Sequence, residues 1–194
     1  APATAPGADA PVPDEARLRA MTARFVPVDI GADVSVLPES ERRALVKMIE
    51  AARVLDGLYL RQVWAGSEAL LFELLADPSP LGQARLHAFL VNKGPWSQLD
   101  HQAPFLPGVP AKPEAANFYP AGATKAEVEA WMKARPEAER TAAAGFFTTI
   151  RRTPKGMLTA VPYSVEYQGE LARAAELLRE AAAATTQPTL KAFL

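Results

Sequence analysis

Residues 37–64, with the sequence LPESERRALVKMIEAARVLDGLYLRQVW, decide the fold class because they predict one long amphipathic helix. Pro38 suits a first helical turn, and Glu39 and Glu41 suit the positive end of the helix dipole. Apolar side chains recur three and four residues apart at Leu45, Met48, Ile49, Ala52, Leu55 and Tyr59. This spacing predicts a helix that runs as far as Trp64.

Helical and hairpin signals continue to the end of the sequence. Ser67 is expected to cap a helix at 68–76 that is apolar nearly all round and therefore buried, and Ser79 and Pro80 predict another helix up to about Asn92. The T-x-x-E capping box at Thr124 opens a fourth helix. Further helices are expected at 136–144, 163–185 and from 188 onward, and a β-hairpin is expected from the runs 146–151 and 157–161 around the turn 153–156.

The sequence before the long helix is different in character. Residues 1–16 hold four prolines and almost no large apolar side chain, so they are expected to form a disordered leader, although a short helix near 15–23 is compatible with the sequence. Residues 25–30 alternate weakly between apolar and other side chains, and Pro27 favours an edge strand or an extended segment there.

Residues 93–123 predict a long, ordered loop. They contain six prolines together with Trp96, Phe105, Phe118 and Tyr119, and a disordered linker would lack such aromatics. The expected fold is therefore mainly α (α+β): a helical domain over residues 17–194 with one small β-hairpin and a long, ordered, Pro-rich loop.

Composition excludes several classes of function. The 194 residues contain no cysteine and two histidines, which excludes disulfide scaffolds, thiol nucleophiles and most zinc sites built by this chain alone. A net charge of −1 argues against a nucleic-acid partner, and no apolar run is long enough for a membrane span. The Ala/Pro/Thr-rich start is typical of an exported, periplasmic protein, with the cytoplasm as the alternative.

Recognisable catalytic motifs are absent from the sequence. There is no H-E-x-x-H, no G-x-S-x-G and no glycine-rich phosphate loop. The segment 92–97, NKGPWS, is the best candidate for a function, because it places an amide, an ammonium and an indole just after a helix end. Gly94 is expected to be the left-handed residue that ends this helix. From the residues alone, a ligand-facing rim and a purely structural helix cap are equally supported.

Five segments together resemble the bacterial branch of the dipeptidyl-peptidase III family. They are 63–66 (VWAG), 76–86 (ADPSPLGQARL), 91–96 (VNKGPW), 107–110 (PGVP) and 116–120 (ANFYP), and the resemblance extends from about residue 37 to 193. Asp100 and the run 105–107 (FLP) add to it.

The resemblance implies a two-lobed zinc exopeptidase that releases dipeptides from the N-termini of short peptides. The family's zinc motif, H-E-x-x-G-H with a later Glu, lies in its C-terminal lobe and is absent from this sequence. The resemblance therefore implies that this chain is the N-terminal lobe or a fragment of it, that it holds no cofactor, and that zinc belongs to a missing C-terminal catalytic lobe. The chain alone is expected to be inactive.

The resemblance also assigns a site. The positions that match the family's cleft-lining element are Asn92, Lys93, Gly94 and Trp96, and a peptide substrate is the expected partner besides the missing lobe. Pro95 departs from the pattern because it lacks a backbone N–H. Two alternatives stay open: a free-standing helical protein-interaction module without catalysis, and a small hydrolase with a carboxylate pair that includes Asp100.

Overall fold

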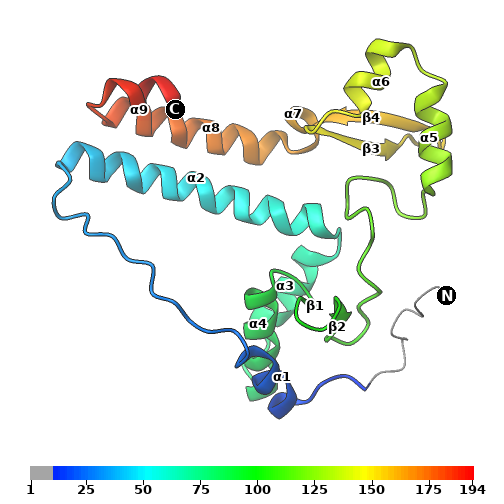
Figure 1. The fold of residues 1–194 in the computed structure, drawn as a ribbon, viewed down its shortest axis with the longest axis horizontal. Helices are drawn as coiled ribbons and strands as arrows, with labels where there is room; N and C mark the ends of the chain where they lie inside the picture. The colour runs from blue at the N-terminus through cyan, green and yellow to red at the C-terminus, as the bar shows by residue number, and fades with distance from the viewer. Residues whose placement is uncertain (1–10) are drawn as a thin grey trace. The chain divides into compact units, whose positions relative to one another are not determined.

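The computed structural model describes residues 11–194 (Figure 1). The chain divides into two compact units. Unit 1 comprises the residues up to Asp29 together with Leu60–Asn117, and unit 2 comprises Ile30–Tyr59 and Phe118–Leu194. The division falls inside α2 (Glu39–Val63), the long helix that the sequence predicts. Each unit has its own buried core, so each is described separately.

Unit 1 packs three helices with a small antiparallel sheet. The helices are α1 (Glu15–Thr22), α3 (Ser67–Ala76) and α4 (Pro80–Asn92), and the sheet pairs β1 (Trp96–Ser97) with β2 (Ala103–Pro104) (Figure 1). Buried apolar side chains from all three helices and from the loop after β2 form one core: Leu18, Met21, Leu74, Ala84, Ala88, Phe89, Phe105 and Leu106. The loop is therefore part of the hydrophobic core.

Local chemistry fixes the start of α4. The Ser79 hydroxyl accepts the Gly82 N–H at 3.0 Å, and Pro80 occupies the first helical position, where a missing N–H costs nothing. Asp77, in an extended conformation, ends α3. The predicted break between the two helices is confirmed.

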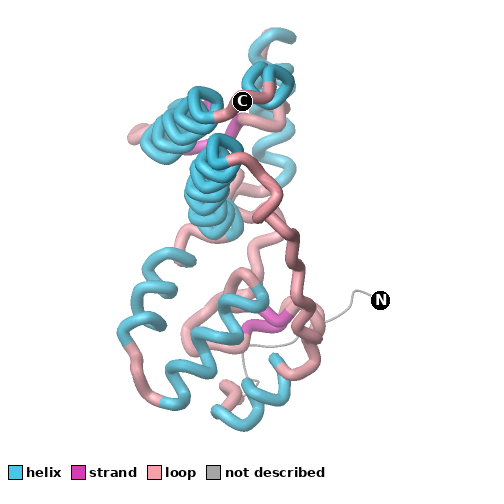
Figure 2. Tube along the Cα trace, turned by 90° about the vertical axis from the view of Figure 1, so that its left-hand side faces the viewer, coloured by secondary structure: helices cyan, strands magenta, loops and turns pink. Residues whose placement is uncertain are grey.

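In unit 2, α2 lies beside α8 (Gln168–Ala184), as Figures 1 and 2 both show. Ala51 of α2 packs against Ala174 and Leu177 of α8, and the Lys47 ammonium lies 2.9 Å from Glu180. Apolar side chains and this ion pair therefore join the two helices.

A buried carboxylate ties the start of α2 to the turn between α8 and α9 (Pro188–Phe193). Glu41 accepts hydrogen bonds from the Thr185 hydroxyl at 2.6 Å, the Thr186 N–H at 2.8 Å and the Thr186 hydroxyl at 2.9 Å. The hydrogen bonds from Thr185 and then from the Thr186 N–H hold the pKa of Glu41 below its usual range.

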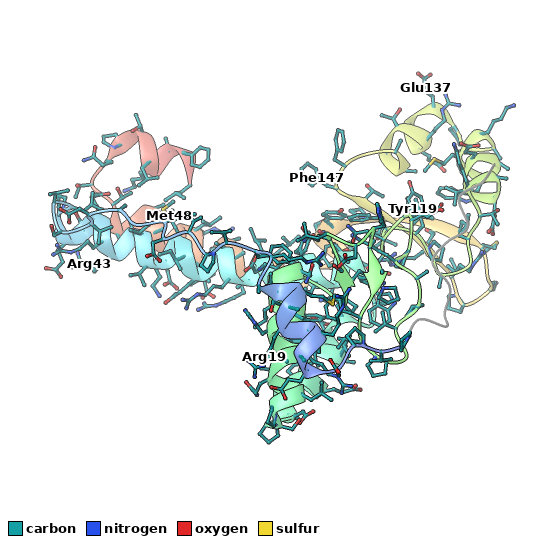
Figure 3. All side chains as sticks on the ribbon, turned by 60° about the horizontal axis from the view of Figure 1, so that its bottom comes forward. Arg19, Arg43, Met48, Tyr119, Glu137 and Phe147 are labelled. Atoms are coloured by element: carbon teal, nitrogen blue, oxygen red, sulfur yellow. The ribbon has the colours of Figure 1, made fainter. Side chains whose placement is uncertain are left out.

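The rest of unit 2 is built on a β-hairpin. Its two antiparallel strands are β3 (Thr148–Arg152) and β4 (Leu158–Pro162). Three helices complete this part of the unit: α5 (Lys125–Lys133), α6 (Glu137–Ala143) and the short α7 (Tyr163–Glu166). Buried side chains from α5, α6 and both strands form the core: Val128, Ala143, Ile150 and Leu158. Figure 3 labels Glu137 on α6 and Tyr119, whose ring packs against this core from the segment before α5.

The mainly α-helical fold with a small hairpin is confirmed, and five local expectations change. Ser67 is the first residue of α3 and not its cap, and α3 is only partly buried, since its Phe72 side chain is 72% exposed. The hairpin strand begins at Thr148, so Phe147 is left largely exposed (Figure 3). The pair β1–β2 adds a second two-stranded sheet. The helix expected at 163–185 is interrupted at Tyr167.

The N-terminal residues differ in part from the expected leader. Residues 1–10 lie outside the described residues, and α1 begins at Glu15, so the last two residues of the expected leader are helical. Among the residues that the structure describes, no helix combines the length and the apolarity that a membrane crossing requires.

Candidate functional site

The candidate segment begins where α4 ends, and its turn is built differently from the prediction. Lys93 holds the left-handed conformation, with φ 53° and ψ 42°, while Gly94 has φ 152°. The Gly94 N–H donates to the carbonyl of Phe89 at 3.0 Å, which closes the helix in a Schellman-type turn. The glycine is needed one position later than expected, and a lysine bears the left-handed strain.

Asn92 is a clamp between α4 and the loop. Its side chain is buried, with 7% exposed. The Nδ2 group donates to the Ala88 carbonyl at 2.9 Å, and Oδ1 accepts the Gln98 N–H at 2.9 Å. The Gln98 side chain makes a third hydrogen bond, in which Nε2 donates to the Asn92 backbone carbonyl at 2.9 Å. These bonds fix the direction in which the chain leaves the helix.

Trp96 anchors the loop from within. The side chain is buried, and its Nε1 donates to the Pro110 carbonyl at 2.9 Å, so it holds together two parts of the Pro-rich loop. Its ring meets Trp64 edge to face, with centroids 5.6 Å apart. The Pro95 carbonyl accepts the Phe105 N–H at 3.1 Å, so Pro95 contributes an acceptor to the loop's own structure.

An ion pair fastens the far side of the β1–β2 turn. The guanidinium of Arg24, just after α1, donates two hydrogen bonds to Asp100, one of them at 2.9 Å, and the Ser97 hydroxyl donates to the same carboxylate at 2.6 Å. Arg24 and then Ser97 lower the pKa of Asp100 to about 2. A general acid needs a raised pKa, so in the carboxylate pair of the small-hydrolase alternative Asp100 fits only the ionised member.

The four predicted site residues therefore share one turn but differ in accessibility. Asn92, Gly94 and Trp96 are buried, and their groups are engaged within unit 1; only Lys93 is exposed. No local sequence pattern marks Arg24, because its partner Asp100 lies 76 positions away in the chain. His101 next to Asp100 is exposed and has a positive φ of 51°.

The residues that the structure describes were also compared with the ligand groups that hold metal ions in proteins. Among the described residues, no group of three or more His, Cys, Asp or Glu side chains gathers as a metal site would need.

Two solved structures are similar to this chain over nearly its whole length, and both are peptidases. One is a dipeptidyl-peptidase III from Corallococcus sp. strain EGB, with 62% sequence identity and a TM-score of 0.91, matched over 94% of this chain and 34% of that chain. The other is DPP III from Caldithrix abyssi, with 39% identity and a TM-score of 0.83, matched over 90% and 33%. The chain thus has the fold of about one third of a peptidase chain. The resemblance to the dipeptidyl-peptidase III family that the sequence indicates is confirmed.

One curated relative carries a different name. It is "Nudix hydrolase 3" from Arabidopsis thaliana, 30% identical over 220 aligned positions that cover 88% of this chain and 28% of that protein. The chain thus spans less than a third of this relative, whose name describes a much longer protein. No family model matches the chain.

Proposed function

We propose that this chain is the peptide-binding N-terminal lobe, or part of it, of a dipeptidyl-peptidase-III-like zinc metallopeptidase that releases N-terminal dipeptides. The observation that carries the proposal is the 62% identity and TM-score of 0.91 with one third of a dipeptidyl-peptidase III. On this proposal the zinc and its ligands belong to the remaining two thirds of the complete protein, and the chain alone does not hydrolyse peptides.

The segment 92–96 is the peptide-facing element in this proposal. Lys93 makes the contact, because it is the exposed member of the segment and its ammonium suits carbonyl and carboxylate oxygens of a peptide. Its backbone is held on both sides, by the Schellman-type turn before it and the buried Trp96 after it. The backbone of Lys93 is therefore already ordered, and only its side chain loses freedom on binding.

Asn92, Gly94 and Trp96 act through Lys93 as positioning residues. Asn92 fixes the exit from α4, Gly94 accepts the φ of 152° that follows, and Trp96 fastens the loop at Pro110. A change at any of them is expected to move Lys93 and therefore to weaken binding indirectly.

The test uses the complete protein that contains this chain, assayed with a dipeptidyl arylamide and with a short peptide. Lys93→Met is expected to lower kcat/KM roughly 10- to 100-fold, since a charged hydrogen bond contributes about 1.5 to 3 kcal/mol. Lys125→Met is the matched control, because Lys125 is 88% exposed on α5 in the other unit. Equal kcat/KM values for the two variants would contradict the role of Lys93.

Two further parts of the proposal have their own readouts. This chain with added zinc is expected to release no dipeptide, whereas release by the chain alone would contradict the assignment of zinc to the remainder. Export to the periplasm is tested by fractionating cells that express the complete gene, and recovery in the cytoplasmic fraction would contradict it.

A further inference from the structure

The segment 25–36, between α1 and α2, exposes an unusual amount of apolar surface. The exposed fraction is 81% for Val26, 74% for Val28, 97% for Ile30 and 78% for Val36. Figure 1 draws the segment as the blue trace that joins α1 to α2, and residues 26–34 belong to no helix or strand. Isolated exposed apolar side chains are normal on a surface, but four in eleven consecutive residues need a physical reason.

The apolar residues of this segment alternate with other residues. Valine, isoleucine or alanine occupies every even position from Val26 to Val36, while Asp29, Gly31, Asp33 and Ser35 occupy odd positions. In an extended chain, side chains two residues apart point to the same face. The segment therefore has the pattern of a β-strand with one face buried and the other in water.

The backbone of the segment is also unpaired within the described part of the chain. None of the backbone–backbone hydrogen bonds there involves residues 26–33. The two small sheets, β1–β2 and β3–β4, each pair only within themselves. The strand pattern thus has no sheet to join among the described residues.

Pro27 determines which edge of the segment can pair. In an extended chain the N–H and C=O groups of residues 26, 28 and 30 point to one edge, and those of residues 27, 29 and 31 point to the other. Pro27 lacks an N–H, so it weakens pairing only along its own edge. The edge formed by Val26, Val28 and Ile30 keeps every donor and acceptor.

We propose that residues 26–30 form an edge strand that pairs, through the groups of Val26, Val28 and Ile30, with a β-sheet in the remainder of the complete protein. The proposal rests on the proposed function in one respect: this chain covers only 34% and 33% of the two dipeptidyl-peptidase III chains, so most of such a protein is available as the partner. The side chains of Val26, Val28 and Ile30 then lie on one face of that sheet, and the core packed against this face covers them.

One register in which the same edge would pair with a second copy of the chain is disfavoured by charge. In an antiparallel pairing centred on Gly31, Asp29 of one copy lies opposite Asp33 of the other. Like charges directly opposite each other destabilise a pair of strands. A sheet elsewhere in the same protein carries no such constraint.

The test is hydrogen–deuterium exchange of the complete protein, resolved to single residues by fragmentation in a mass spectrometer. The amides of Val26, Val28 and Ile30 are expected to exchange at least about 100-fold more slowly than those of Asp29 and Gly31. Uniformly fast exchange over the five residues would overturn the proposal, as would protection of Asp29 and Gly31 instead.

A pair of proline variants tests the same edge by stability. Val28→Pro removes an N–H from the paired edge, whereas Asp29→Pro removes one from the opposite edge, and an extended chain accommodates both. Val28→Pro is expected to lower the unfolding midpoint of the complete protein by several degrees more than Asp29→Pro. Equal midpoints would overturn the proposal.

The readouts also separate this proposal from the proposed function. If the complete protein lacks dipeptidyl-peptidase activity but the amides of Val26, Val28 and Ile30 are protected, only the proposed function is contradicted. If the protein is active but these amides are unprotected, only the proposed edge strand is contradicted. Protection that grows with protein concentration would assign the edge to a second copy and overturn the partner named here.

Discussion

Replacing Asn92 by alanine is expected to destabilise unit 1, because this side chain joins α4 to the loop. Asn92→Ala removes the bond from Nδ2 to the Ala88 carbonyl and the bond from the Gln98 N–H to Oδ1, both 2.9 Å long. Each bond contributes about 0.5 to 1.5 kcal/mol, so the expected loss is about 2 kcal/mol of unfolding free energy. For a chain of this size that corresponds to a fall of about 4 to 8 °C in Tm.

The assay is urea unfolding followed by tryptophan fluorescence. Two of the three tryptophans, Trp64 and Trp96, lie in unit 1 and report on its core contact. Gln98→Ala is the matched control, because it removes only the bond to the Asn92 carbonyl and comes from an exposed side chain. An Asn92→Ala loss below about 0.5 kcal/mol, or one no larger than that of the control, would refute the clamp.

Three further predictions concern charge and packing. Because the folded-state pKa of Asp100 is about 2, below its ordinary 3.8, its stabilisation is present above pH ~4 and lost as the pH falls toward 2. Asp100→Asn should flatten this part of the urea-midpoint profile by at most about 1 kcal/mol after solvent screening, and an unchanged profile would contradict the ion pair. Glu41, whose pKa is also lowered, should lose its contribution as the pH falls below its ordinary range, and Glu41→Gln should remove that dependence from the unfolding of unit 2. Gly66→Ala should cost about 1 to 3 kcal/mol by thermal unfolding, because a Cβ there would overlap the Trp64 ring. Gly57→Ala, in open space within α2, should instead stabilise by about 0.5 to 1 kcal/mol.

Features that depend on neighbouring residues could be predicted from the sequence. Ser79 caps α4 and Thr124 caps α5, because a short polar side chain can satisfy only the N–H groups two or three residues ahead of it. The turn before Met157 was also predictable from nearby residues, because Gly156 takes the positive φ of 79° that the hairpin needs.

Features that depend on distant residues could not be predicted. The bonds of Glu41 to Thr185 span 144 positions, and those of Arg24 to Asp100 span 76, with no local pattern to mark either pair. The burial of the candidate site is of the same kind. From the sequence a ligand-facing rim and a structural helix cap are equally supported, and the burial of Trp96 depends on its contacts with Trp64 and Pro110.

Which product the complete protein releases from a short peptide is the most direct test of the central claim. A pentapeptide with a free N-terminus is incubated with the complete protein and zinc, and the products are identified by mass spectrometry. The proposed function predicts the N-terminal dipeptide and the complementary tripeptide, with much slower release by Lys93→Met. Intact peptide under these conditions, or cleavage at another bond, would contradict it.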